Sequence, residues 1–149
     1  MEKYLIGYND EKPVFVKPII LGILGKHESI DKQTIHDEIL HPLVSVLGRL
    51  PDKILGPEEG VSSAYISIWA DRNEIPTQML NADWRKLQRK AGILRDARIL
   101  KESTHLVIFQ GPRSKIYEQT AIREVKKGKQ VFIVDHGTHE IAELSVEVA

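Results

Sequence analysis

The chain has no cysteine, no long apolar run and no excess of charge of either sign. The absence of cysteine excludes disulfide bonds, thiolate metal ligands and a cysteine nucleophile, and it is typical of proteins from a reducing cytoplasm. Lysine plus arginine and aspartate plus glutamate both count 21, so the formal net charge is zero. That balance, with no stripe of interleaved aromatic and basic residues, argues against general nucleic-acid binding.

Apolar runs such as Ile19 to Leu24 have only the length of a strand, and the first residues lack the apolar stretch of a signal peptide. We therefore expect a cytoplasmic protein that makes no contact with a membrane. With 149 residues, 42% of them hydrophobic, the chain has the size of one domain, over residues 1–149, and enough apolar surface to bury a core.

Short apolar runs alternate with segments of helical period, which predicts an α/β protein with a mainly parallel sheet and helices on both faces. The predicted strands span residues 19–25, 53–56, 75–80, 105–109 and 130–134. Helices are predicted at residues 61–73 and 115–127. Another helix carries Leu87, Ala91, Leu94 and Ala97 on its buried face, and a first helix, capped by Asp31 or Ser29, bends or breaks at Pro42.

The two ends of the chain lie outside this alternation. Residues 3–8 and 14–17 predict a short strand pair, which we interpret as an edge extension of the sheet over residues 1–18. The C-terminal tail, residues 138–149, forms either a strand or a helix, and Val146 with Val148 favours the strand.

Residues that follow the strands are the candidates for a binding site, because open α/β sheets bind ligands beyond the carboxyl ends of their strands. Gly25 permits close backbone approach, and Lys26 can meet a phosphate. Gly60, Ser62 and Ser63 either offer amides and hydroxyls to a ligand or cap the helix that begins there.

Two large side chains between the third and fourth predicted strands have two interpretations each. Trp84 either stacks on a base or packs into the core. Arg95 lies in the middle of an otherwise apolar helix, and it either faces water or reaches into the ligand cleft.

A tryptophan, Ala91-Gly92, Arg95-Asp96, an apolar strand and a glycine turn follow one another in this chain. This order resembles the SLOG superfamily of Rossmann-like proteins, particularly its YspA-like branch, from about residue 19 to residue 135. The related LOG proteins carry Pro-Gly-Gly-x-Gly-Thr-x-x-Glu and release bases from nucleoside monophosphates. Over the same nine positions, Gln110 to Glu118, only Gly111 and Glu118 match.

The resemblance implies a three-layer Rossmann-like fold with Arg95 and Glu118 nearest an N-glycosidic bond. The arginine would hold phosphate or ribose, and the carboxylate would assist an oxocarbenium-like centre. Pro112 removes one amide that would wrap a phosphate, and Arg113 can replace it with side-chain charge. Glu118 can equally be a first-turn acid that suits the helix dipole.

The sequence therefore predicts a sensor or binding module for a nucleotide or ribose-phosphate derivative. The predicted ligand-binding residues are Gly25, Lys26, Gly60, Ser62, Ser63, Trp84, Arg95, Asp96, Gly111, Arg113 and Ser114. The alternative is a nucleotide N-glycoside hydrolase with Glu118 and Arg95 as catalytic residues. We expect no cofactor and no metal, since neither the His36 and His41 pair nor the His136 and His139 pair has metal-site spacing. A homodimer is expected, because related proteins often build their sites across one.

Overall fold

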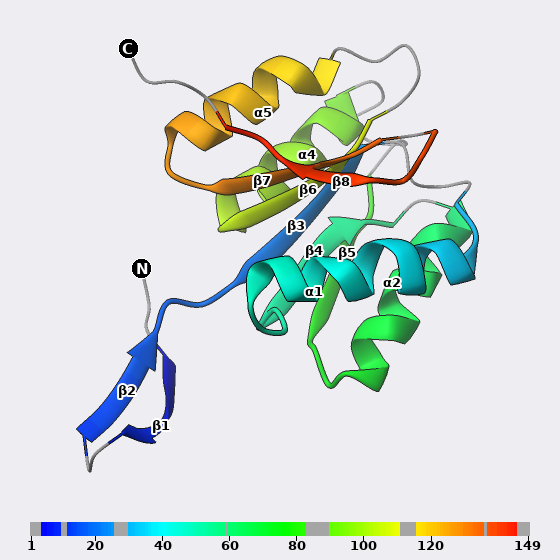
Figure 1. The fold of residues 1–149 in the computed structure, drawn as a ribbon. Helices are drawn as coiled ribbons and strands as arrows, with labels where there is room; N and C mark the ends of the chain where they lie inside the picture. Colours follow the sequence, from blue (N-terminus) through cyan, green and yellow to red (C-terminus); the bar gives the residue numbers. More distant parts are fainter. Residues whose placement is uncertain are drawn as a thin grey trace.

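The computed structural model describes residues 4–9, 12–25, 30–58, 60–82, 90–110, 116–135 and 137–145, and for residues 4–16 and 116 it describes the backbone alone. Six strands form one sheet in the order β5-β4-β3-β6-β7-β8 (Figure 1). The bounds of these strands are β3 Ile20–Gly25, β4 Lys53–Pro57, β5 Thr77–Leu80, β6 His105–Phe109, β7 Gln130–Val134 and β8 Ile141–Glu143. All neighbouring pairs are parallel except β7 with β8, so the predicted α/β sheet is confirmed.

The strands lie where the apolar runs predict them. β6 and β7 coincide with the predicted ranges, and β5 begins two residues later than expected, at Thr77. Pro76, just before β5, has no N–H to give to the ladder, although its carbonyl still accepts a hydrogen bond from Ile54 (3.0 Å).

Helices cover both faces of the sheet, which makes the fold a three-layer, Rossmann-like one (Figure 1). One face carries η1 (Thr34–Leu40), α1 (His41–Leu47) and α2 (Gly60–Arg72), and the other carries α4 (Lys90–Glu102) and α5 (Ile116–Lys126). Successive residues of a strand serve opposite faces: Leu21 and Ile23 of β3 belong to the core under η1 and α2, and Leu24 belongs to the core under α4 and α5.

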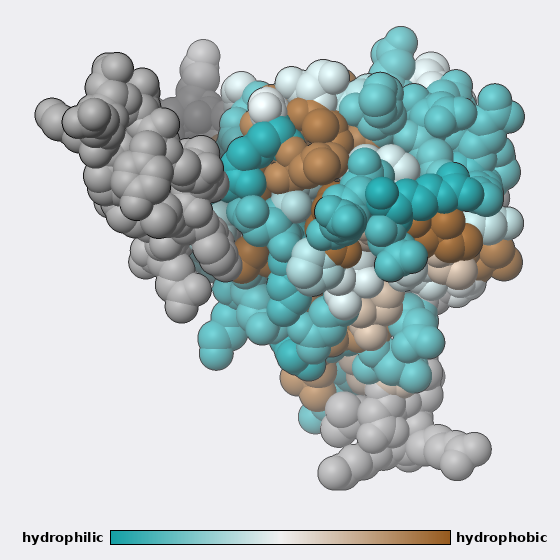
Figure 2. Space-filling model, turned by 90° about the horizontal axis from the view of Figure 1, so that it is seen from below, coloured by the Kyte–Doolittle hydropathy of each residue, from teal (hydrophilic) through white to brown (hydrophobic). Residues whose placement is uncertain are grey.

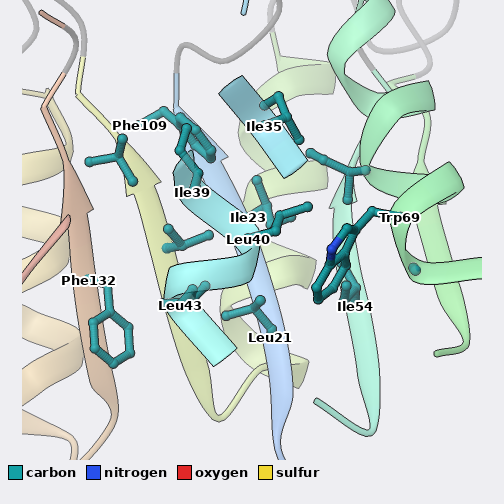
Figure 3. Close-up of a cluster of buried hydrophobic side chains, with 14 of the residues drawn as sticks. Leu21, Ile23, Ile35, Ile39, Leu40, Leu43, Ile54, Trp69, Phe109 and Phe132 are labelled. Carbon is teal, nitrogen blue, oxygen red and sulfur yellow. The ribbon is translucent and has the colours of Figure 1, made fainter. Parts of the chain in front are cut away.

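The core under η1 and α2 is built mainly from aliphatic side chains, together with Trp69, Phe109 and Phe132 (Figure 3). Trp69 of α2 lies beside Ile54 of β4, while Ile35 and Ile39 of η1 lie over β3. Ile35, Ile39 and Ile54 are fully buried, and Trp69 is 8% exposed. These contacts fix α2 and η1 on the sheet.

The first helix is a π-helix, η1, that continues directly into α1 at Pro42. The predicted break at Pro42 therefore takes the form of a wider turn: the N–H of His41 bonds to the carbonyl of His36, five residues back. Asp31 caps this helix as expected, since its carboxylate accepts hydrogen bonds from the N–H (3.3 Å) and the hydroxyl (2.5 Å) of Thr34. These hydrogen bonds hold the pKa of Asp31 below its ordinary value.

The buried face of α4 differs from the predicted one. Ala91 and Ile99 are buried, whereas Leu94 is 51% exposed and Ala97 lies on the surface. The reason lies in β3, where Gly22 leaves room for close approach: a Cβ at this position would lie 2.9 Å from Ile99 Cγ2. Ile99 occupies the space that a side chain at residue 22 would fill, so α4 is rotated with Ile99 toward β3 and Leu94 toward solvent.

The ends of the chain also form strands. β1 (Tyr4–Asn9) and β2 (Lys12–Val16) pair antiparallel, which confirms the predicted strand pair. They form a two-stranded sheet of their own instead of extending the edge of the six-stranded sheet, and Figure 1 draws the pair apart from it. The C-terminal tail forms a strand, β8, which is one of the two predicted alternatives. Val146 and Val148 lie outside the described residues.

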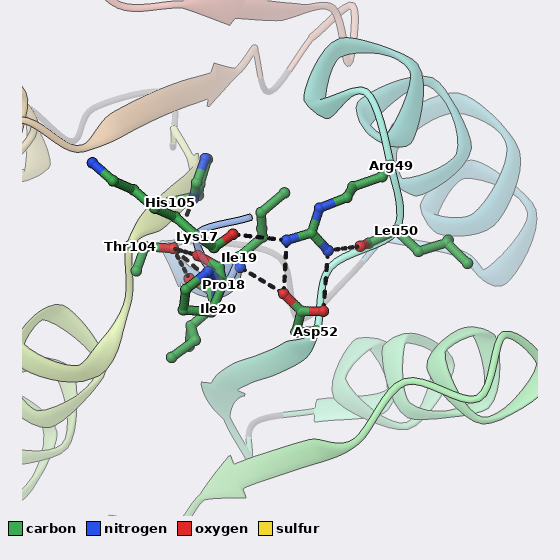
Figure 4. A network of polar contacts seen from close by, with 9 residues as sticks. All are labelled: Lys17, Pro18, Ile19, Ile20, Arg49, Leu50, Asp52, Thr104 and His105. Carbon is green, nitrogen blue, oxygen red and sulfur yellow. Dashed lines mark hydrogen bonds and ion pairs between the residues drawn. The ribbon is translucent and has the colours of Figure 1, made fainter. Parts of the chain in front are cut away.

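Polar contacts fix the point where the chain enters β3 (Figure 4). Arg49 pairs with both carboxylate oxygens of Asp52 (3.0 and 2.9 Å) and donates to the carbonyl of Lys17, while Asp52 accepts from the N–H of Ile19 (2.8 Å). The hydrogen bonds from Arg49 hold the pKa of Asp52 below its ordinary value. Thr104 accepts from the N–H of Ile20 (2.9 Å).

The molecular surface carries both apolar and hydrophilic side chains. Figure 2, which views the molecule from below, shows apolar patches interrupted by hydrophilic side chains. Among the residues that the structure describes, no helix is both long and apolar enough to cross a membrane.

Candidate functional site

The strand order places a topological switch point between β3 and β6. The chain leaves β3 toward β4 and β5 on one side, and it leaves β6 toward β7 and β8 on the other. Loops diverge at such a point and leave a crevice at the carboxyl edge of the sheet, where open α/β proteins bind their ligands. The switch point is therefore the candidate functional site of this chain.

Gly25 ends β3 at this point and is paired with Phe109, the last residue of β6. Its φ is +98°, and a Cβ there would lie 2.1 Å from the carbonyl oxygen of Phe109. Only glycine fits this backbone and this contact, so the close approach that the sequence predicts for Gly25 exists between two strands. Its role toward a ligand stays a prediction.

The N-terminus of α2 lies at the same edge, after β4. Gly60 has a φ of 63°. The hydroxyl of Ser63 donates to the carbonyl of Gly60 (3.0 Å), and the hydroxyl of Ser62 donates to the carbonyl of Ile30 (3.3 Å). Both serines are buried, and in these contacts their hydroxyls satisfy backbone carbonyls, whereas a helix cap would accept from N–H groups. Their predicted roles toward a ligand or as caps stay predictions. Ser62 ties α2 to the segment that follows the loop after β3.

A hollow of about 550 Å³ lies beside this helix end, and Glu58, Gly60, Ser63 and Met79 are among its lining residues. Glu58 continues the ladder beyond β4, since its N–H bonds to the carbonyl of Leu80 (2.9 Å). Its carboxylate makes this hollow a poor place for a phosphate and a better one for ribose hydroxyls.

Arg95 belongs to a partly buried polar cluster on the other face of the sheet. Its Nε donates to Asp96 Oδ1 (3.1 Å), and the hydroxyl of Tyr117 donates to Asp96 Oδ2 (3.2 Å). The side chain of Arg95 is 8% exposed, which rules out the interpretation that it faces water. α4 runs from the carboxyl edge of the sheet toward the start of β6, so Arg95, in its second turn, lies near that edge.

Tyr117 also joins this cluster to a groove that we call the α5 groove. It has a volume of about 430 Å³ and a polar end formed by Gln110, Tyr117 and Glu118. The remainder of the α5 groove is apolar, with Ile108, Ile122, Ile133 and Leu144 among its lining residues. Glu118 is exposed in the first turn of α5, where both of its predicted roles remain open.

The structure thus brings Arg95, Asp96 and Glu118 into one neighbourhood through Tyr117. Several other predicted site residues lie outside the described residues: Lys26, Trp84, Gly111, Arg113 and Ser114. Sequence reasoning missed Tyr117 and Gln110. Tyr117 stands at a variable position of the stretch compared with the LOG pattern, and Gln110 replaces the first proline of that pattern, so the pattern singles out neither residue.

The histidines show no metal site within the described part of the chain. His36 is buried, and its Nε2 lies 2.7 Å from the carbonyl oxygen of Tyr65, whereas His41 is exposed. His139 lies in the β7–β8 turn, whose Asp135 carboxylate accepts from the N–H groups of Gly137 and Thr138. No group of three or more ligand-type side chains gathers among the described residues.

Comparison with protein-family models, curated proteins and solved structures finds no match to this chain.

Proposed function

We propose that this protein binds a nucleotide or a ribose-phosphate derivative at the switch point between β3 and β6, as a sensor or binding module. Arg95 carries the proposal. Its side chain is 8% exposed and so has given up most of its hydration, and Asp96 orients the guanidinium from the neighbouring position near the carboxyl edge. Arginine in such a setting suits recognition of phosphate, because its planar fork forms paired charge-assisted hydrogen bonds.

A thermal-shift screen tests the proposal directly. The panel contains nucleoside monophosphates, ADP-ribose, cyclic ADP-ribose, NAD and ribose phosphates. A ligand at about 100 times its Kd raises the free energy of unfolding by about 2.7 kcal/mol, a shift that the method resolves easily. No response to any member of the panel would refute the proposal.

Arg95→Gln with Arg98→Gln as its control separates the proposed role from general charge effects. Arg98 lies on the same helix, is 52% exposed and pairs with Glu102 (2.9 Å), so its loss removes one positive charge away from the partly buried cluster. We expect the ligand response to disappear in Arg95→Gln and to persist in Arg98→Gln. Equal responses in both variants would exclude Arg95 from the site.

The second candidate function is hydrolysis of a nucleotide N-glycosidic bond. Glu118 favours it, since its carboxylate lies at the polar end of the α5 groove next to Tyr117, which contacts the Arg95 partner Asp96. Release of free base by the purified protein, lost in Glu118→Gln while ligand binding is kept, would establish this activity. Gln119→Ala, one exposed residue further along α5, is the matched control.

The proposal extends to a homodimer, because proteins that the sequence resembles often build their sites across one, and to a cytoplasmic location, which the lack of cysteine and of a long apolar run favours. Analytical ultracentrifugation with and without the ligand measures the first of these. A monomer in both conditions would remove the homodimer from the proposal and leave the ligand site unaffected.

A further inference from the structure

The α5 groove has the chemical character of a site for one planar organic group. Its volume of about 430 Å³ falls within the range of small-molecule sites. Ile108 of β6 and Ile133 of β7 lie on the sheet side, and Ile122 comes from α5. Aliphatic side chains of the sheet and of α5 can thus offer dispersion contacts to the faces of a flat ring.

Hydrogen-bonding groups are concentrated at one end of the α5 groove. Gln110 follows the carboxyl end of β6, and its amide can both donate and accept, while the carboxylate of Glu118 accepts. The backbone of Gln110 is held by the bond from its N–H to the carbonyl of Val134 (3.1 Å). A ring with apolar faces and a polar edge satisfies both parts of such a groove, and purine and pyrimidine bases have this character.

The polar end of the α5 groove is connected to the proposed phosphate-binding group. Tyr117 lines the groove and donates its hydroxyl to Asp96 (3.2 Å), and Asp96 pairs with Arg95 (3.1 Å). The two contacts place the guanidinium and the groove on either side of one carboxylate. A ligand with a phosphate at Arg95 therefore has the groove within reach of its other end.

We infer that the α5 groove binds the base of the ligand, so that the protein recognises a base-bearing nucleotide in preference to a bare ribose phosphate. This inference rests on the proposed function and assigns the ligand class of that site. Gln110 and Glu118 contact the edge of the base, Ile122 packs on its face, and Tyr117 positions the groove against Arg95.

Calorimetric titration with two probes tests the inference. AMP carries both groups, whereas ribose 5-phosphate carries the phosphate and sugar alone. We expect AMP to bind the natural protein more tightly by on the order of tenfold or more, the discrimination that burial of a ring and its polar edge provides. Ile122→Trp fills the groove and should bring the affinity ratio close to one while leaving ribose 5-phosphate unchanged. Arg123→Trp is the control, because Arg123 is exposed on the same helix and does not line the groove.

The possible results distinguish failure of the proposed function from failure of this inference alone. If neither probe binds, the proposed function and this inference both fail. If ribose 5-phosphate binds and AMP binds no more tightly, only the inference fails. It also fails if Ile122→Trp unfolds at the same temperature as Arg123→Trp and still keeps the preference for AMP. Should Ile122→Trp not fold, Gln110→Ala at an exposed position gives the same test, and an unchanged affinity ratio there overturns the inference.

Discussion

Replacement of Gly25 by alanine should destabilise the protein far more than the same change at Gly128. The two glycines have nearly the same backbone, with φ of +98° and +97°. Their surroundings differ: a Cβ at residue 25 would lie 2.1 Å from the Phe109 carbonyl oxygen, whereas nothing lies within 4 Å of a Cβ at residue 128. Gly128→Ala therefore measures the conformational cost alone, and Gly25→Ala adds the steric cost.

The magnitude follows from the two contributions. A left-handed backbone costs an L side chain roughly 1–2 kcal/mol, which is the expected loss for Gly128→Ala. At residue 25 the Cβ must move from 2.1 Å to an ordinary contact of at least 3.4 Å from a backbone atom of a paired strand. Overpacking of this kind costs roughly 1–3 kcal/mol more, so Gly25→Ala should lose about 2–5 kcal/mol in total.

Urea unfolding followed by circular dichroism measures the difference. With an m-value of roughly 2 kcal/mol per molar urea, the two midpoints should differ by roughly 1 M, with Gly25→Ala the lower. Equal midpoints for the two variants would show that β3 and β6 do not approach each other at Gly25 as described. The geometry of the switch point would then have to be abandoned.

Three other changes test the fold away from the site. Glu74 lies just after α2 and has a φ of 57°, next to the hydrogen bond from the N–H of Ile75 to the carbonyl of Ala70. Because glycine adopts this backbone without strain, Glu74→Gly should stabilise the protein by roughly 0.5–1 kcal/mol. A lower unfolding temperature would contradict this. Thr104→Val leaves the N–H of Ile20 without its acceptor and should lower the free energy of unfolding, measured in urea, by roughly 1–2 kcal/mol. Thr138→Val in the exposed β7–β8 turn is the control and should lower it by less. The pKa of Asp52 lies below its ordinary value of 3.8 in the folded protein, so its contribution to stability is present above that pH and is lost as the pH falls through the lower folded pKa. The free energy of unfolding, plotted against pH between about pH 5 and pH 2, should thus fall less steeply for Asp52→Asn than for the natural protein. Parallel plots for the two proteins would show that the pairing of Asp52 with Arg49 contributes nothing to stability.

The strands could be predicted from the sequence because each buried parallel strand is a continuous apolar run between polar or glycine residues. His105–Phe109 and Gln130–Val134 are such runs, and the structure reproduces both. The orientation of α4 could not be predicted in this way. Hydrophobicity favours burial of Leu94, yet the helix buries Ile99, which fills the space beside Gly22 of β3. A helical period contains no information about the surface that the helix meets.

Part of the candidate site could likewise be predicted from the sequence. Gly25 and Arg95 are recognisable as a glycine after a strand and a charge within an apolar helix. The contact between Tyr117 and Asp96 depends on the rotation of α4, so any error in the buried face of that helix hides the partner of Asp96. The α5 groove is hidden for the same reason, because it is formed by residues of β6, β7 and α5 and of the segments after β6 and β8, whose spacing along the chain follows no motif.

The position of β3 between β4 and β6 also bears on how the chain acquires its structure during synthesis. The N–H of Ile20 bonds to Thr104, 84 residues later, and β3 pairs with β6 along its whole length. At ribosomal rates of roughly 5–20 residues per second, β3 waits roughly 4–17 s for that partner. Proteolysis of nascent chains arrested before and after β6 would measure this interval as the onset of protection. Until it ends, β3 has one open edge, and an open edge can pair with strands of other chains.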